Sequence, residues 1–128
     1  MVEEVSTDAA PNSESLPFSQ GIVHGDTVYT SGQIGMDPET GEVVEGGIRA
    51  ETRRTMENVA AVLEAAGSSL DDAIKATVFL TDMDDFAAFN EVYAEYVSEP
   101  RPARSAVEVS GLARDIAVEV EMVAALER

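Results

Sequence analysis

A single helical period in the middle of the chain restricts the possible folds more than any other feature. Six residues recur every three or four positions, which is the spacing of one face of an α-helix. They are Ile48, Thr52, Met56, Val59, Leu63 and Ala66. Gly67 follows directly and stands where a C-terminal helix cap belongs. Because such a helix must bury its apolar face, the rest of the chain has to supply a surface that covers it.

Short β-rich segments on both sides of this helix supply that surface. Gly25-Asp26 separates the first two segments and is the signal of a two-residue hairpin turn. Turn residues at Pro38 and Gly41 precede a short extended piece. The expected extended segments are residues 21–24, 27–31, 42–44, 73–81, 103–109 and 116–126.

A second helical period lies between two of these strands. Met83, Phe86, Phe89, Tyr93 and Val97 are spaced by three or four residues. We expect Asp82 to cap this helix, and Pro100 and Pro102 to prevent its continuation.

The resulting order of elements is β-β-α-β-α-β-β. It predicts an α+β fold in which both helices pack on one face of a sheet. Phe79, Val123 and Ala125 would then expose apolar surface on the other face. We therefore expect self-association to bury that face.

The length of 128 residues suits one domain with one hydrophobic core. Residues 1–15 are polar and acidic, without a sustained period, and predict a flexible N-terminal arm before a single domain over residues 16–128. The chain shows neither a signal peptide nor an apolar run long enough to span a membrane. We expect a cytoplasmic protein.

Negative charge dominates the composition. The chain has 25 acidic residues against eight basic ones, of which only Lys75 is a lysine, and its formal net charge is −17. Such a surface repels nucleic acids, whose affinity for proteins comes largely from Lys and Arg. An acidic, lysine-poor surface is also typical of proteins that stay soluble in concentrated salt, so we expect a halophilic source.

Cysteine is absent, which excludes disulfides and thiolate chemistry. His24 is the only histidine, so a zinc site is not expected. Its position beside the Gly25-Asp26 turn favours a surface location.

Six segments together resemble the RidA (YjgF-like) family of reactive intermediate deaminases, and the match runs from about Leu16 almost to the C-terminus. They are "PFSQG" at 17–21, "YTSGQIGMDPETGEVV" at 29–44, "TRRTMENVAAVLEAAGSSLDD" at 52–72, "KATVFLTDMDDFAAFNEVYAEY" at 75–96, "PARSAVEV" at 102–109 and "VEVEMVA" at 118–124.

This resemblance implies a chorismate-mutase-like α+β fold that forms a homotrimer with clefts between subunits. It further implies hydrolysis of enamines and imines, such as 2-aminoacrylate and 2-iminobutanoate, to 2-keto acids and ammonia, without a cofactor or metal. In the family motifs, the position of Arg104 holds the substrate carboxylate and that of Glu119 positions and activates water.

The family motifs also assign the walls of the cleft. Ser31 and Gly32 of "SGQ", and Asn90 and Tyr93 of "N-x-x-Y", are expected to line it. Two further lining positions depart from the commoner pattern: Phe18 stands where many members have tyrosine, and Ala106 where many have cysteine. The first change removes a hydroxyl group, and the second indicates that no thiol chemistry is needed.

Spacing alone does not single out these residues. An arginine near the start of a strand is most often a surface residue, and Arg101 is expected to be one. Glu119 and Glu121 alternate with valines, as in any half-solvated strand. Asn90 lies inside a helix, where its poor propensity predicts a compensating side-chain hydrogen bond.

Two other functions are compatible with the sequence. The chain could form a non-enzymatic trimer that binds keto acids or amino acids through Arg104. Alternatively, it could act on RNA as a translation inhibitor, an activity attributed to some relatives, although the net charge of −17 opposes this.

Overall fold

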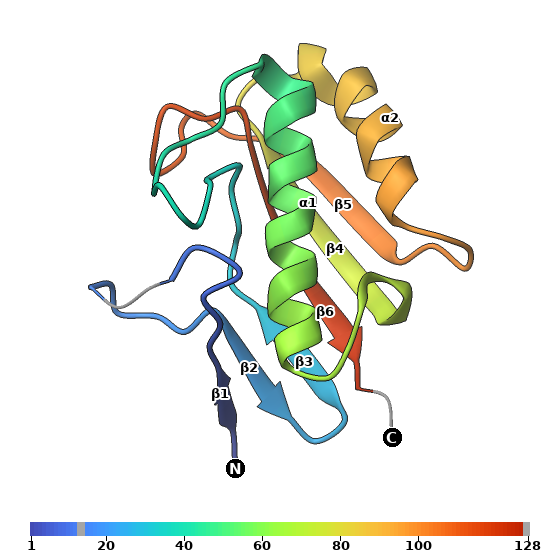
Figure 1. Cartoon of the computed structure of the whole chain (residues 1–128). Helices are drawn as coiled ribbons and strands as arrows, with labels where there is room; N and C mark the ends of the chain where they lie inside the picture. Colours follow the sequence, from blue (N-terminus) through green and yellow to red (C-terminus); the bar gives the residue numbers. More distant parts are fainter. Residues whose placement is uncertain (13–14, 127–128) are drawn as a thin grey trace.

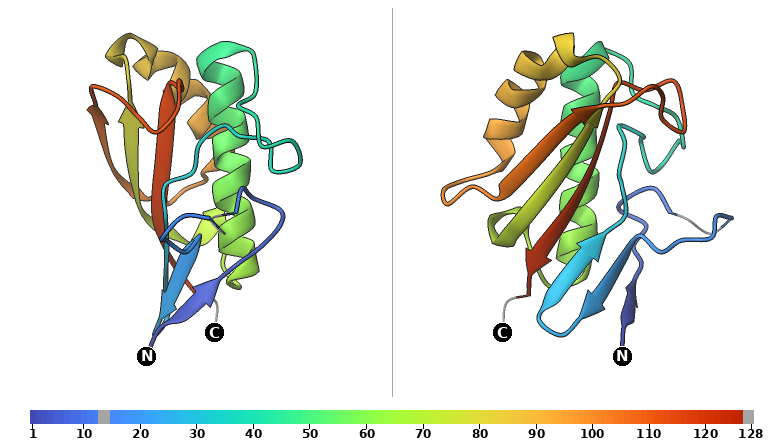
Figure 2. Two further views of the ribbon diagram at one scale, coloured as in Figure 1. Left: turned by 90° about the vertical axis from the view of Figure 1, so that its left-hand side faces the viewer. Right: turned by 180° about the vertical axis from the view of Figure 1, so that it is seen from behind.

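The computed structural model describes residues 1–12 and 15–126 (Figure 1). They form one six-stranded sheet, with its strands in the order β1-β2-β3-β6-β4-β5, and two α-helices. The strands are β1 (Glu3–Val5), β2 (Gly21–His24), β3 (Thr27–Thr30), β4 (Ala73–Leu80), β5 (Ala103–Glu108) and β6 (Val118–Ala125), and the helices are α1 (Gly47–Ala65) and α2 (Phe86–Tyr96). Both helices cover the same face of the sheet, and seen from behind the strands lie in front of them (Figure 2). The predicted α+β layer architecture is confirmed.

Strand β4 lies between β6 and β5 in the sheet. It pairs with β6 in antiparallel orientation and with β5 in parallel orientation. Parallel neighbours need a crossover connection, and α2 provides it between β4 and β5. The register places Ala76 opposite Arg104, and Phe79 opposite Glu119.

The core lies between the sheet and α1. Alternate residues of β4 and β6, such as Val78 and Val120, are fully buried. Met56, Val59 and Leu63 of α1 pack in the same cluster and carry the predicted helical period. The helix ends as expected at Gly67, whose φ of +90° is a left-handed conformation that glycine adopts without strain.

The N-terminal segment is more ordered than the sequence predicts. Within residues 1–12, Glu3–Val5 add a strand to the edge of the sheet, and the side chain of Val5 is only 4% exposed. The Gln20 amide donates hydrogen bonds to the backbone carbonyls of Thr7, Ala10 and Pro11. The expectation of a loose arm is therefore wrong for these residues, because a buried apolar side chain and a buried amide hold them.

Two other elements differ from the expectation. Residues 42–44 form no strand, and only Val43 makes an isolated bridge to Met36. The second helix begins at Phe86, after a 3-10 turn over Met83–Asp85 that the Asp82 carboxylate caps by accepting a hydrogen bond from the Asp84 amide. Met83 is consequently exposed rather than part of the apolar face.

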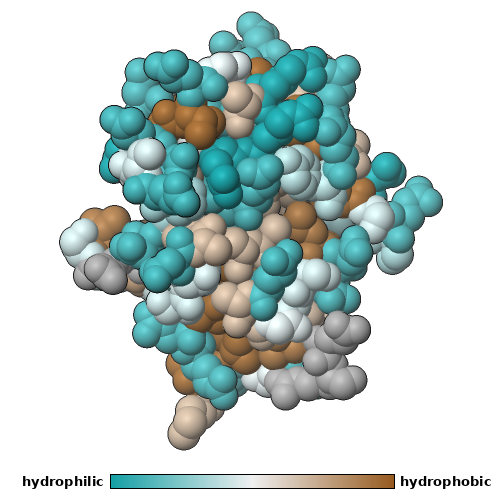
Figure 3. All heavy atoms as spheres, in the orientation of Figure 1, coloured by the Kyte–Doolittle hydropathy of each residue, from teal (hydrophilic) through white to brown (hydrophobic). Residues whose placement is uncertain are grey.

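No helix of the described residues covers the second face of the sheet. Tyr29 and Val107 on this face are 46% and 44% exposed, and Phe79 and Val123 are half-buried. The helix-bearing face instead shows mostly hydrophilic residues over its upper part (Figure 3). The uncovered apolar strip agrees with the expected self-association, which remains a prediction. None of the helices in the described residues is both long and apolar enough to cross a membrane.

Candidate active site

The predicted site residues gather at two separate places. Arg104 contacts the aromatic rings of α2, and we call Arg104, Phe86, Phe89 and Tyr93 the arginine cluster. Four predicted residues line one hollow of about 480 Å³, which we call the glutamate pocket. These four are Phe18, Ser31, Gly32 and Glu119.

Three rings surround the guanidinium in the arginine cluster. The Arg104 Cζ atom lies 5.0 Å from the ring centroid of Tyr93, 5.5 Å from that of Phe86 and 5.7 Å from that of Phe89. Distances below about 6 Å allow cation–π attraction. Phe86, Phe89 and Tyr93 reach Arg104 together because their spacing places them on one face of α2. The rings hold the guanidinium without using its hydrogen-bond donors.

Two polar atoms of α2 are buried without a hydrogen-bond partner among the described residues. They are Oδ1 of Asn90 and the hydroxyl oxygen of Tyr93. The hydrogen bond expected to compensate for Asn90 in the helix is therefore absent at Oδ1. Burial raises the pKa of the Tyr93 hydroxyl, and the positive charge of Arg104 partly offsets this. An unpaired buried polar group costs about 1–3 kcal/mol, so each atom would gain from a hydrogen-bond partner that reaches it.

Arg104 also lacks an acidic partner among residues 1–12 and 15–126, which is unusual in so acidic a chain. Four other arginines form ion pairs with glutamates. These four are Arg49, Arg53, Arg54 and Arg101. Within the described residues, only Arg104 and Arg114 form none. Ala106 follows two positions after Arg104 on β5, hence on the same face of the sheet, and is half-buried.

In the glutamate pocket, Gly32 determines where the carboxylate lies. A Cβ atom added to Gly32 would stand 2.0 Å from Oε2 of Glu119 and 2.7 Å from its carboxyl carbon. The carboxylate therefore rests against the bare Cα of residue 32, and any side chain there would displace it. In this chain, the glycine of "SGQ" makes this contact possible.

Backbone hydrogen bonds fix Gly32 beside Glu119. The amides of Gln33 and Val120 donate to each other's carbonyl oxygens, at 2.9 and 3.0 Å. The Ser31 hydroxyl donates to the carbonyl oxygen of Ser19 at 2.6 Å, so it serves to hold the preceding segment. Residues 31–33 are thereby held in register with β6.

Sequence reasoning missed Glu51, whose side chain binds the backbone just before β6. This residue of α1 is only 9% exposed, and its Oε1 accepts a hydrogen bond from the Ala117 amide at 2.8 Å. The contact fixes the backbone two residues before Glu119. A glutamate directly beside the buried helical period was the available signal, since charged residues are rarely buried without a partner.

The environment of Glu119 raises the pKa of its carboxyl group above that of an ordinary glutamate. Burial raises the pKa of its carboxyl group, and the negative charge of Glu121 raises it further. The side chain makes no hydrogen bond to any described residue. A carboxylate of this kind can accept a proton from water and return it at a pH closer to neutral than an ordinary glutamate. No cluster of metal-ligating side chains occurs among residues 1–12 and 15–126.

Arg104 and Glu119 lie on opposite faces of the sheet. Arg104 is paired with Ala76, which is buried on the helix-bearing face, whereas Glu119 is paired with Phe79, which lies on the other face. Paired residues of neighbouring strands share a face, and consecutive residues alternate. One small molecule therefore cannot contact both groups within a single chain.

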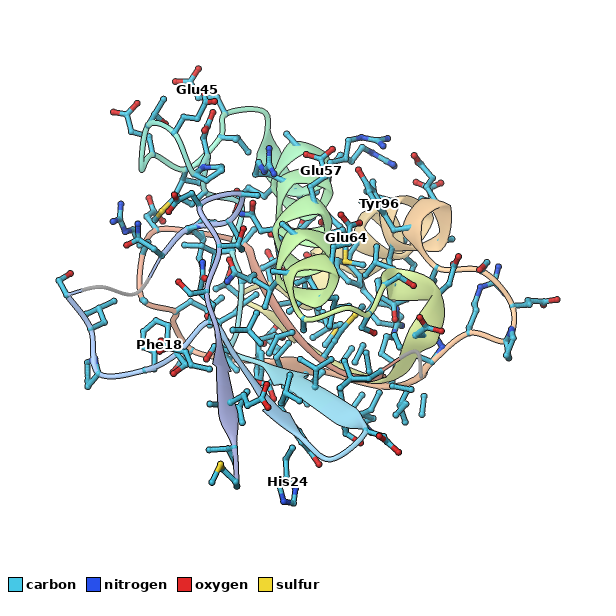
Figure 4. The ribbon with its side chains drawn as sticks, turned by 60° about the horizontal axis from the view of Figure 1, so that its bottom comes forward. Phe18, His24, Glu45, Glu57, Glu64 and Tyr96 are labelled. Atoms are coloured by element: carbon cyan, nitrogen blue, oxygen red, sulfur yellow. The ribbon has the colours of Figure 1, made fainter. Side chains whose placement is uncertain are left out.

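Phe18, at the rim of the glutamate pocket, and His24 both lie at the surface of the molecule. Phe18 is 49% exposed and lies on the segment before β2, at the side of the molecule (Figure 4). His24 lies at the end of the β2–β3 hairpin and points into solvent, which confirms its surface location (Figure 4).

Comparisons with known proteins match almost the whole chain. The model of the family described as Endoribonuclease L-PSP matches residues 7–126. A RutC family protein of Pyrococcus horikoshii is 52% identical over 124 residues, which cover 97% of this chain and 98% of the relative. The human 2-iminobutanoate/2-iminopropanoate deaminase is 40% identical over 120 residues, covering 94% and 87% of the two chains.

Solved structures give the same result. RidA from a Psychrobacter species has a TM-score of 0.92 at 45% identity, covering 97% of this chain and 99% of that one. E. coli TdcF, whose structure holds bound serine, has a TM-score of 0.91 at 39% identity, covering 98% and 99%. The chain therefore belongs to the Endoribonuclease L-PSP family, which is the RidA (YjgF-like) family that its sequence resembles.

Proposed function

We propose that this protein hydrolyses reactive enamines and imines of small 2-amino acids, of the 2-aminoacrylate and 2-iminobutanoate type, to 2-keto acids and ammonia. The observation that carries the proposal is a complementary pair of groups without partners among the described residues: Arg104 has no acidic partner there, and Glu119 has a raised pKa. The deaminase activity named for the human relative, and the serine bound to TdcF, support a substrate that carries a carboxylate.

The opposite faces of the two groups require assembly. A complete site forms where the arginine cluster of one copy meets the glutamate pocket of another, and the exposed apolar residues of the uncovered sheet face provide a contact surface. We propose a homotrimer with one such cleft at each interface.

In this cleft, the planar guanidinium of Arg104 binds the substrate carboxylate through paired hydrogen bonds. Glu119 orients a water molecule and accepts one of its protons, while the water oxygen adds to the carbon of the C=N bond. Glu119 passes this proton to nitrogen, which gives a carbinolamine. Glu119 then accepts the proton of the carbinolamine hydroxyl and returns it to the nitrogen, the C–N bond breaks, and ammonia leaves while the carbon becomes a ketone. An enamine first takes a proton at its terminal carbon to become the imine. The reaction consumes one water molecule and needs no cofactor or metal.

The other site residues shape this cleft. Phe18, Ser31 and Gly32 line the side that holds the water, and Asn90, Tyr93 and Ala106 line the side that holds the carboxylate. The buried oxygens of Asn90 and Tyr93 have no hydrogen-bond partner among the described residues, and the substrate supplies one when the side chains that cover them move aside.

The test is imine hydrolysis by purified protein, with 2-iminobutanoate generated in situ by an amino-acid oxidase. We expect Arg104→Ala and Glu119→Gln each to lower the catalysed rate by about 100-fold or more without unfolding the protein. Arg101→Ala is the matched control, because Arg101 is exposed and pairs with Glu99 outside both clusters. Wild-type activity in either site variant contradicts its assigned role.

Glu119→Gln also separates catalysis from simple binding. If the protein is a deaminase, this variant loses hydrolysis but still binds 2-oxobutanoate through Arg104. If wild type binds the keto acid but accelerates no imine hydrolysis, the protein is a small-molecule binding trimer instead.

An action on RNA is the remaining alternative, and the family description includes an endoribonuclease. The net charge of −17 opposes it, because phosphate backbones bind through Lys and Arg. We expect no RNA cleavage by a preparation shown to be free of contaminating nuclease.

A further inference from the structure

A second arginine faces the same hollow as Glu119 and has no role in the reaction described above. Arg114 lines the glutamate pocket, and Arg114 and Glu119 are the only charged residues among the described side chains that line it. Arg114 forms neither an ion pair nor a side-chain hydrogen bond with any described residue. Although the chain has 25 acidic residues, none in its described part occupies this cationic group.

The backbone that carries Arg114 is well anchored although its side chain is exposed. The Ile116 amide donates to the Arg114 carbonyl oxygen at 2.9 Å, and the Ile116 side chain is only 5% exposed. The next amide, of Ala117, donates to Glu51 at 2.8 Å, and the Ala117 carbonyl accepts from the Thr81 amide at 3.1 Å. Arg114 therefore projects from a fixed position five residues before Glu119.

The glutamate pocket is large enough to hold a longer substrate than a four-carbon imine. Its volume of about 480 Å³ lies within the range that accommodates ligands much larger than a four-carbon acid. Arg104 approaches the substrate from another copy and takes the carboxylate beside the C=N bond. A cation within the glutamate pocket then faces the far end of the substrate. An uncharged alkyl chain forms no ion pair with Arg114, whereas a second carboxylate does.

We propose that Arg114 selects imines with a second, distal carboxylate, the class formed by oxidation of acidic amino acids such as glutamate. The inference rests on the proposed function, because it places the reacting carbon beside Glu119. Arg114 binds the distal carboxylate and offsets the repulsion that the dianion meets from Glu119 and from the acidic surface. The residue determines specificity and takes no part in proton transfer.

The kinetic test compares imines generated in situ from glutamate and from 2-aminobutyrate, at low salt. We expect Arg114→Gln to lower kcat/KM about five- to tenfold for the dicarboxylic imine and less than twofold for the monocarboxylic one. Molar KCl should reduce this difference, since Arg114 is exposed. Arg101→Gln is the control and should change neither value. An equal effect of Arg114→Gln on both imines, or no effect on either, overturns the proposal.

A binding measurement keeps this inference separate from the proposed function. Titration calorimetry with 2-oxoglutarate and 2-oxobutanoate does not require catalysis. We expect wild type to bind 2-oxoglutarate more tightly, and Arg114→Gln to abolish that preference even in a Glu119→Gln background. If no imine is hydrolysed but this preference exists and depends on Arg114, the deaminase proposal fails while Arg114 keeps its role in selecting a dicarboxylate. If wild type shows no preference, the role of Arg114 is refuted.

Discussion

The arginine cluster and the glutamate pocket position their charged groups, Arg104 and Glu119, by different kinds of contact. Arg104 lies against three aromatic rings on the helix-bearing side of the sheet, and its position depends on side chains of α2. Glu119 rests against a glycine on the other side, and its position depends on backbone hydrogen bonds between residues 33 and 120. Arg104 is positioned by side-chain packing. Glu119 occupies space that is free only because Gly32 has no side chain.

This difference shows how a chain with so much negative charge can keep Arg104 apart from acidic side chains. Arg104 is enclosed by rings that offer no carboxylate, whereas the arginines on α1 pair with acidic residues of α1 or α2. Neither the arginine cluster nor the glutamate pocket is a complete site by itself, because the sheet separates Arg104 from Glu119. Assembly is therefore part of the chemistry that we propose.

Gly32→Ala should produce the largest effect on the glutamate pocket. The new Cβ would lie 2.0 Å from a carboxylate oxygen of Glu119, and this flexible side chain can rotate away. We expect a loss of activity of about 100-fold or more with little loss of stability, because the base is misplaced while the core is untouched.

Gly111→Ala is the control for this substitution. Its added Cβ would meet no atom within 4 Å. Activity measurements together with thermal unfolding check the prediction. Near-normal activity in Gly32→Ala would show that the position of the Glu119 carboxylate does not matter.

Tyr93→Phe tests the arginine cluster with a smaller change. The Tyr93 hydroxyl is buried without a partner among the described residues, so its removal should leave stability unchanged or raise it by up to about 1 kcal/mol. If the hydroxyl receives the substrate, kcat/KM should fall about tenfold. Tyr96→Phe on the same helix is the control, since its hydroxyl reaches Glu57 instead. A clear loss of stability in Tyr93→Phe would assign the hydroxyl a structural partner.

Glu121→Gln should shift the pH dependence of the reaction. Glu121 is the second cause, after burial, that raises the pKa of Glu119. Removing its negative charge favours the ionised form of Glu119, so the pKa falls and the acid limb of the rate profile moves to lower pH, by less than about one unit. The profile of kcat against pH measures this shift. Glu64→Gln, on the exposed side of α1, should leave the profile unchanged, and an upward shift in Glu121→Gln would contradict the assignment of the base.

Salt should have the smallest effect on the difference between the arginine cluster and the glutamate pocket, because it screens charges over the whole surface. The net charge of −17 predicts self-repulsion that KCl screens, so the unfolding midpoint should rise from low to molar KCl. Exposed ion pairs such as Arg53–Glu95 weaken in salt but contribute little. A midpoint that does not rise would remove the basis for expecting a halophilic protein.

The sequence predicted the layered fold well because its signals are local. The period from Ile48 to Ala66, the Gly25-Asp26 turn and the alternation in β6 each determine an element within a few residues. β1 was missed because three residues of an acidic segment carry no period, and only the burial of Val5 against distant residues makes them a strand.

The candidate site was predicted through family motifs and not through spacing. Nothing in the pattern of β6 distinguishes Glu119 from Glu121; the difference lies in the contact with Gly32, which is 87 residues away in the chain (119 − 32 = 87). Arg114 and Glu51 escaped notice for the same reason, since their roles depend on a pocket and a buried amide that only the folded chain brings together.

Mixing two inactive variants tests the separation of the two charges most directly. Arg104→Ala and Glu119→Gln are co-expressed, or unfolded and refolded together, in equal amounts. Half of the copies then retain Arg104 and the other half retain Glu119, so random assembly restores about one quarter of the shared sites (½ × ½). The account predicts that the mixture recovers about a quarter of wild-type activity. A mixture no more active than the two variants measured separately would contradict it.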